Sequence, residues 1–149
     1  MIQRIQSLFL FAIAGTSTIL ILKPFETVKD SAGTYFVSLM PGALINIVKP
    51  VIYAPMAINF IIIALSLYTI FKYKNRRKQI KFCQIILALS TILIGNMFVF
   101  TFLNTPNETA IVDYTKYAFI PAINIVLAFF ARWFIKKDDN LVRSADRIR

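Results

Sequence analysis

The chain contains no histidine, which is unusual for 149 residues. This absence excludes histidine-ligated haem and zinc sites and removes the usual general acid–base group at neutral pH. There is one cysteine, Cys83, so an intrachain disulfide is excluded, and we interpret Cys83 as a small apolar core residue. Reversible acylation is the alternative, because Cys83 follows a basic run at an expected membrane boundary.

Acidic residues are also scarce. Seven Asp and Glu stand against 17 Lys and Arg, which gives a formal net charge of +10. The acids fall in the connecting segments and the tail, without the paired arrangement that general acid–base catalysis requires. We therefore expect neither an enzyme nor a bound cofactor or metal, although the carboxylates of two separate loops could still meet in space. These seven residues are Glu26, Asp30, Glu108, Asp113, Asp138, Asp139 and Asp146.

Charge is absent from four long apolar segments, at residues 5–22, 50–71, 82–103 and 117–135, apart from Arg132 near the end of the last. About 20 apolar residues cross a bilayer, so each segment predicts a transmembrane helix, with Arg132 snorkelling to the interface beside Trp133. The first segment is longer than the ~7–15 residues of a signal-peptide core, and we expect it to be retained.

The distribution of charge predicts the orientation of these spans. The segment between the second and third spans has six basic residues and no acid, whereas the other two connections are nearly neutral. Short loops rich in Lys and Arg stay in the cytoplasm. We therefore predict an all-α membrane protein, a single domain over 1–149. Its four helices would form an up-down antiparallel bundle with both termini cytoplasmic, and 136–149 would be a cytoplasmic helical tail.

The basic connection consists of Lys72, Lys74, Arg76, Arg77, Lys78 and Lys81. On a soluble protein such a run would suggest nucleic acid. Here orientation and attraction to anionic headgroups account for it, so we expect the phospholipid bilayer as partner and do not expect nucleic acid.

Uncharged polar residues lie at a similar depth in all four predicted spans: Thr16, Ser17, Thr18, Asn59, Asn96 and Asn124. One interpretation of this polar layer is interhelical hydrogen bonding that stabilises the bundle. The other is a polar pocket that opens outward and holds a ligand. Pro55 and Pro121 lie near this layer and are expected to kink their helices.

The two connections opposite the basic loop differ in length. The connection over 23–49 contains "TYFVSLM" (34–40), which predicts a short strand or an interfacial segment outside the cytoplasm. The connection over 104–116 is shorter, and "NTPNET" (104–109) predicts a turn.

The tail lacks helix breakers, and its apolar residues fall on one face, which suggests that it docks on a partner protein. A solvated helix end among the headgroups is the alternative. With the N-terminus, the candidate docking residues are Arg4, Leu141, Arg143, Asp146, Arg147 and Ile148.

The segments "MIQRIQSLFL" (1–10) and "KKDDNLVRSADRIR" (136–149) bracket this four-span layout. In these features the chain resembles a family of small inner-membrane proteins from Bacteroidota, of the domain-of-unknown-function 4293 type. The resemblance implies a bacterial inner membrane and adds weight to both ends as functional surface. It carries no activity and transfers no catalytic residue.

The sequence thus leads us to expect a non-enzymatic accessory subunit of a larger inner-membrane complex, with protein export or membrane-protein insertion machinery as host and other inner-membrane proteins as partners. The alternative is small-molecule or lipid binding or transport through the polar layer.

Overall fold

The computed structural model describes residues 2–30, 33–39, 53–73, 75–104 and 111–146. Most of them lie in four long helices: α1 (Ile2–Leu22), α2 (Tyr53–Phe71), α3 (Arg76–Asn104) and α4 (Ile120–Asp146). Each contains a stretch long and apolar enough to cross a bilayer. The prediction of four such helices is confirmed, and they are consistent with a multi-pass membrane protein.

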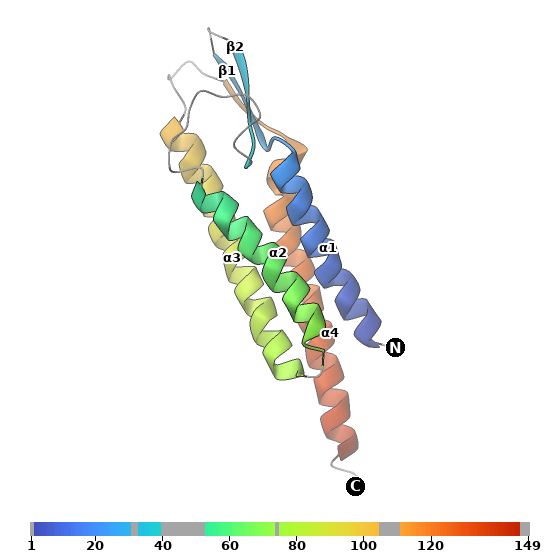
Figure 1. Cartoon of the computed structure of the whole chain (residues 1–149). Coiled ribbons are helices and arrows are strands. Elements are labelled where there is room, and N and C mark those ends of the chain that lie inside the picture. Colours follow the sequence, from blue (N-terminus) through green and yellow to red (C-terminus); the bar gives the residue numbers. More distant parts are fainter. Residues whose placement is uncertain (1, 31–32, 40–52, 74, 105–110, 147–149) are drawn as a thin grey trace.

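The four helices lie side by side, and successive helices run in opposite directions (Figure 1). Each packs on its neighbours in the chain, and α4 closes the ring by packing on α1. Both chain ends lie at one end of the bundle, and a small sheet covers the other. This end is called the sheet end below, and the opposite one the basic end.

Every helix carries a stripe of buried positions spaced alternately four and three residues apart, as in a coiled coil. Many of them are small or polar, which is typical of helix contacts in membranes because small side chains let backbones approach closely. The stripe on α1 is Gln6, Leu10, Ile13, Ser17 and Leu20; on α2, Pro55, Asn59, Ile62, Ser66 and Thr69; on α3, Gln79, Cys83, Ile86, Ser90, Leu93, Met97 and Phe100; on α4, Asn124, Ala128, Ala131 and Ile135.

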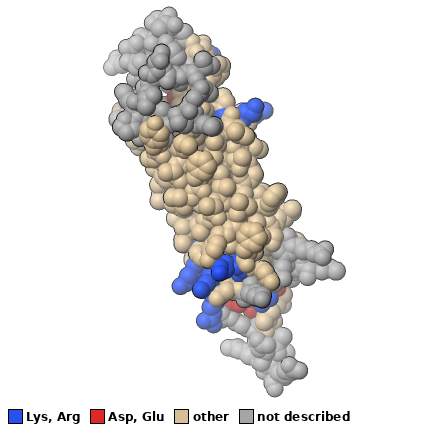
Figure 2. Space-filling model, viewed as in Figure 1, with Lys and Arg blue, Asp and Glu red and all other residues tan. Residues whose placement is uncertain are grey.

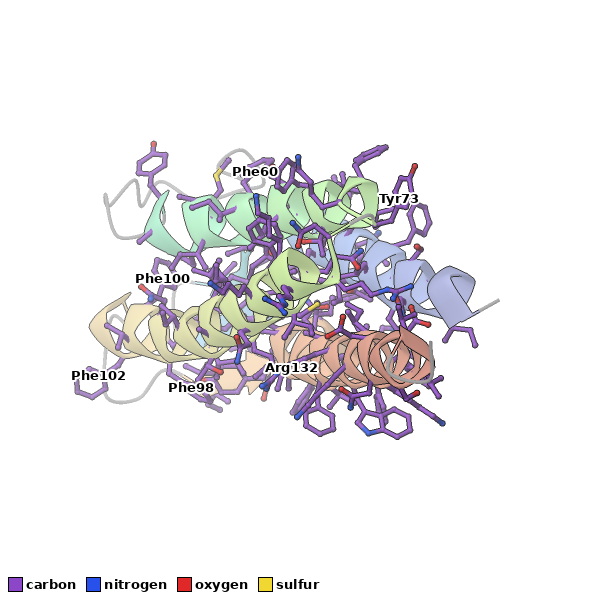
Figure 3. The ribbon with its side chains drawn as sticks, turned by 90° about the horizontal axis from the view of Figure 1, so that it is seen from below. Phe60, Tyr73, Phe98, Phe100, Phe102 and Arg132 are labelled. Carbon is purple, nitrogen blue, oxygen red and sulfur yellow. The ribbon has the colours of Figure 1, made fainter. Side chains whose placement is uncertain are left out.

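Large apolar side chains cover the outside of the bundle. Phe60, Phe98 and Phe102 point away from it, whereas Phe100 points inward (Figure 3). The exposed fraction of Phe102 is 85%, against 6% for Phe100. Apolar side chains on the outside and small polar ones inside are the arrangement expected of helices surrounded by lipid.

The sheet consists of β1 (Glu26–Asp30), β2 (Gly33–Val37) and β3 (Ile111–Tyr114), in the order β2-β1-β3. Both pairings are antiparallel, and β1 pairs Glu26 with Val37 on one side and with Tyr114 on the other. The expected strand over 34–40 corresponds to β2. β1 and β3 are not expected from the sequence, because β3 lies in the connection with the predicted turn and its pairing with β1 is not local. The residues 105–109 of that turn lie outside the described part of the chain.

The sheet packs firmly on the bundle. Phe25 is buried and meets the Phe100 ring edge-on at a centroid distance of 6.4 Å. The Thr115 hydroxyl donates to the Pro24 carbonyl at 2.7 Å, and the Thr115 amide donates to the Phe25 carbonyl at 3.0 Å. These bonds join the two connections to each other just above the helix ends.

Two expectations about helix boundaries are corrected. The basic connection is not a loop over 72–81, because α3 begins at Arg76; Lys and Arg favour helices, and the Asn75 side chain caps the start by accepting from the Lys78 amide at 3.3 Å. Pro55 and Pro121 lie in the first turns of α2 and α4 rather than inside long helices. In a first turn the missing proline N–H breaks no intrahelical bond, so neither residue needs to kink its helix.

Candidate functional site

Four of the predicted polar residues meet inside the bundle, where α1, α2 and α4 face one another. The Thr16 hydroxyl donates to Asn124 Oδ1 at 2.6 Å, and Asn124 Nδ2 donates to the Ser17 hydroxyl at 2.9 Å. Asn59 Nδ2 donates to the Ser17 backbone carbonyl at 2.9 Å. Ser17, Asn59 and Asn124 are fully buried, so these bonds form away from solvent. We call these four residues the polar cluster.

Every buried side-chain nitrogen and oxygen of the polar cluster except one has at least one hydrogen-bond partner. Asn124 uses both ends of its amide, and the Thr16 hydroxyl has the Ala12 carbonyl, at 2.9 Å, as a second acceptor. Asn59 Oδ1 is the exception, since it has no partner among the residues that the structure describes. Chemically the cluster joins three helices, and it offers one unoccupied acceptor.

Thr18 and Asn96 do not join the polar cluster. Thr18 is exposed and donates to the Ala14 carbonyl of its own helix at 2.8 Å, while Asn96 Nδ2 donates to the Ile92 carbonyl of α3 at 3.1 Å. Each lies about 100° around its helix from a buried neighbour, Ser17 or Met97. The layer expected from sequence therefore involves three helices rather than four.

A second set of buried polar residues lies nearer the basic end, and the sequence analysis did not select it. Gln79 Nε2 of α3 donates to the Thr69 carbonyl of α2 at 3.1 Å and so joins two helices. Ser66 donates to its own helix, while Gln6 Nε2 and Ser90 Oγ have no partner in the described part of the chain. The signal that would have found them is their position in the four-and-three spacing.

Glu26, the first residue of β1, carries a buried carboxyl between the sheet and α3, with an exposed fraction of 2%. The Thr101 hydroxyl of α3 donates to Glu26 Oε2 at 2.5 Å and also lies 3.1 Å from the Met97 carbonyl. The single Thr101 hydroxyl proton can be donated to only one of these two acceptors at a time. Both hydrogen bonds form together only when Glu26 is protonated: Glu26 then donates to the Thr101 oxygen, and Thr101 donates to the Met97 carbonyl. Burial raises the pKa of Glu26, against the smaller lowering effect of the Thr101 bond.

From the sequence alone Glu26 lies in a connection between two spans and has no expected role. The period of two along a strand puts Glu26 on the same face as Val28, which is also buried. That signal becomes readable only when 26–30 is assigned as a strand.

The basic end carries a band of cationic side chains next to a belt without charge (Figure 2). Arg76 Nε of α3 pairs with Asp138 Oδ2 of α4 at 3.1 Å, with side-chain exposures of 24% and 15%. The Lys72 amine lies 5.2 Å from the Tyr68 ring centroid, and the Lys137 amine 5.5 Å from that of Trp133. Of the predicted basic residues, Lys72, Arg77, Lys78 and Lys81 are exposed, and Lys74 lies outside the described residues.

The candidate docking residues at the chain ends are described only in part. Leu141 is half exposed on α4. Arg4 belongs to α1, and Arg143 and Asp146 belong to α4, which continues as one helix to Asp146. Arg147 and Ile148 lie outside the described residues. Within the described ranges, no three His, Cys, Asp or Glu side chains are grouped so that they could hold a metal ion.

Comparison with known proteins gave one match. The model of a family described as Domain of unknown function (DUF4293) matches residues 2–148, which is nearly the whole chain. Neither the curated proteins nor the solved structures gave a match.

Proposed function

We propose that this chain, which belongs to the DUF4293 family, acts as a non-enzymatic accessory subunit of a larger complex in a bacterial inner membrane. The family description assigns no activity, so the proposal depends on the geometry of the bundle. We propose protein export or membrane-protein insertion machinery as the host. The extension of α4 past its apolar part, with acidic and basic residues mixed, favours a protein contact over lipid binding alone.

In the proposed orientation the basic end faces the cytoplasm. The turn between α2 and α3 and both chain ends lie there, whereas the sheet lies at the opposite end (Figure 1). Short connections rich in Lys and Arg are retained on the cytoplasmic side, and this supports termini inside and the sheet outside.

The observation that carries the proposal is Gly95. It lies on the exposed face of α3, and a Cβ added to it would meet nothing within 4 Å. Glycine costs about 1 kcal/mol relative to alanine in a helix, and no neighbour among the described residues requires the space beside Gly95. Ala88 and Thr91 lie on the same exposed side of α3. A strip of small residues facing lipid is what a helix of another protein needs in order to pack closely.

The interior of the bundle supports the same proposal. The polar cluster uses its hydrogen bonds to join α1, α2 and α4, and the sheet is bonded to the end of the bundle. Such a body keeps its shape while its outer surfaces contact other proteins.

Gly95→Leu tests the proposal, with Gly15→Leu as the matched control. Gly15 is also exposed, on α1, and a Cβ there also meets nothing within 4 Å, so both variants should fold. After purification in a gentle detergent at native expression, mass spectrometry should find partner membrane proteins with the wild type and the control, and lose them with Gly95→Leu. Recovery of the wild type as a lone monomer or as a self-oligomer would refute the accessory role.

A second candidate function is ligand binding or transport through the polar cluster. The observation in its favour is the buried, unpartnered Asn59 Oδ1, because a ligand donor could occupy it. Substituting Asn59 and Asn124 together by Leu should then abolish ligand binding in a bundle that still folds, whereas Asn96→Leu, outside the cluster, should not. A change in thermal stability alone would assign the cluster to helix packing.

A further inference from the structure

Arg132 is a charged side chain inside the fourth apolar span. It precedes Asp138 by six residues on α4, which at 1.5 Å per residue places it about 9 Å nearer the middle of the bundle than the Arg76–Asp138 ion pair. Its side chain is half-buried. Arg132 therefore lies just inside the boundary between the cationic band and the uncharged belt.

No carboxylate in the described part of the chain forms an ion pair with Arg132. Asp138, six residues further along α4, is already paired with Arg76. A charge within the apolar zone is costly unless an anion or a polar group is present, and such residues mark a site whose partner should be sought. The described residues therefore supply a guanidinium at this depth without a carboxylate as its counter-ion.

Arg132 lies near the place where α3 and α4 are joined, since Arg76 of α3 meets Asp138 of α4 about one and a half turns further along α4. We call this place the seam. The side chain lies on the side of α4 that faces α3 (Figure 3). Gln84, which follows Cys83 on α3, is exposed, and Lys136, one turn from Arg132 on α4, is exposed too.

We propose that this seam binds the phosphate of one anionic phospholipid, with the Arg132 guanidinium donating two parallel hydrogen bonds to it. A phosphate oxygen pair matches the guanidinium fork, and the long Arg132 side chain can snorkel from the apolar belt toward the level of the lipid phosphates. Lys136 adds a second positive charge, and Gln84 offers an amide to headgroup hydroxyls. A zwitterionic headgroup is disfavoured, because its cationic amine would lie beside Lys136.

A lipid fits this place better than an acidic protein segment does. A protein carboxylate would have to lose its hydration to reach Arg132, whereas a phospholipid phosphate already resides at the boundary with its chains in the apolar belt. The exposed Phe129, one turn deeper on α4, continues this apolar surface below the seam. The proposed lipid site does not depend on the accessory role, since it needs only the bilayer.

The experiment places the full chain in nanodiscs of phosphatidylcholine with a minor fraction of phosphatidylglycerol, and counts retained lipids by native mass spectrometry. Arg132→Gln should lower the affinity for phosphatidylglycerol about tenfold, the effect of losing a charge-assisted hydrogen bond of about 1.5 kcal/mol. Lys72→Gln is the matched control, because it removes the same charge at the basic end from an exposed site beside Tyr68 on α2. It should change the affinity less than about twofold.

Equal losses in the two variants would show diffuse attraction to the cationic band and would overturn the proposal. So would a wild type without preference for phosphatidylglycerol, or an acidic protein that occupies Arg132 in place of lipid. A second measurement needs no variant: Trp133, the only tryptophan, is adjacent to Arg132. Brominated phosphatidylglycerol should quench its fluorescence more strongly than brominated phosphatidylcholine at equal mole fraction, and equal quenching would count against the site.

Discussion

Asn124→Leu is the sharpest test of the polar cluster. The substitution removes the bond that Asn124 accepts from Thr16, at 2.6 Å, and the bond that it donates to Ser17, at 2.9 Å. Interhelical hydrogen bonds in membranes contribute about 0.6 kcal/mol each on average, so two of them amount to about 1 kcal/mol. In the variant the Thr16 hydroxyl keeps a hydrogen-bond acceptor, the Ala12 carbonyl at 2.9 Å. The loss in the free energy of unfolding should therefore not exceed about 1 kcal/mol.

The matched control is Asn96→Leu, the same substitution in a residue that bonds only to its own helix, at Ile92. We expect its free energy of unfolding to stay within about 0.5 kcal/mol of the wild type, as for residues that are not part of a buried network. Reversible unfolding of both variants by denaturing detergent in mixed micelles would measure the two free energies. If both variants lose the same stability, or if Asn124→Leu loses none, the assignment of the cluster to three helices is wrong.

Three further predictions concern the ends of the bundle. The folded-state pKa of Glu26 is raised above its ordinary 4.5, so the fold favours the neutral carboxyl. This contribution to stability should be full below pH 4.5 and should be lost as the pH rises through the raised pKa. Glu26→Gln should abolish this pH dependence in thermal unfolding measured across pH. Phe25→Ala should cost about 3 kcal/mol in the free energy of unfolding, because it empties a fully buried site against Phe100; an unchanged melting temperature would contradict this. Asp138→Asn should lower stability by about 1 kcal/mol at low salt by leaving Arg76 without its counter-ion, and by less at high salt; a loss independent of salt would argue against the ion pair.

The helices could be predicted from the sequence because their cause is local. A long uncharged segment must satisfy its backbone within itself when no water is present, so it becomes a helix whatever lies beside it. The helix starts were predicted less accurately than the helices themselves. α3 starts at Arg76 because the Asn75 side chain caps it, and α4 starts just before Pro121 because a first turn tolerates proline. Most of the sheet could not be predicted from the sequence. Glu26 of β1 pairs with Tyr114 of β3, far away in the chain, and no local sequence pattern indicates that pairing.

By itself the sequence determined the four apolar helices and the unequal charge of the two ends, because hydropathy and charge are properties of segments. Only the tertiary structure decided which polar residues act together. The rotation of each helix about its axis brings Asn124 to Ser17 and leaves Asn96 on its own helix, although both lie at a similar depth in the sequence pattern. Asp138 likewise pairs with Arg76 of α3, and among the described residues no carboxylate pairs with Arg132. The distance between helices, and not the spacing along one helix, decides which charges form an ion pair.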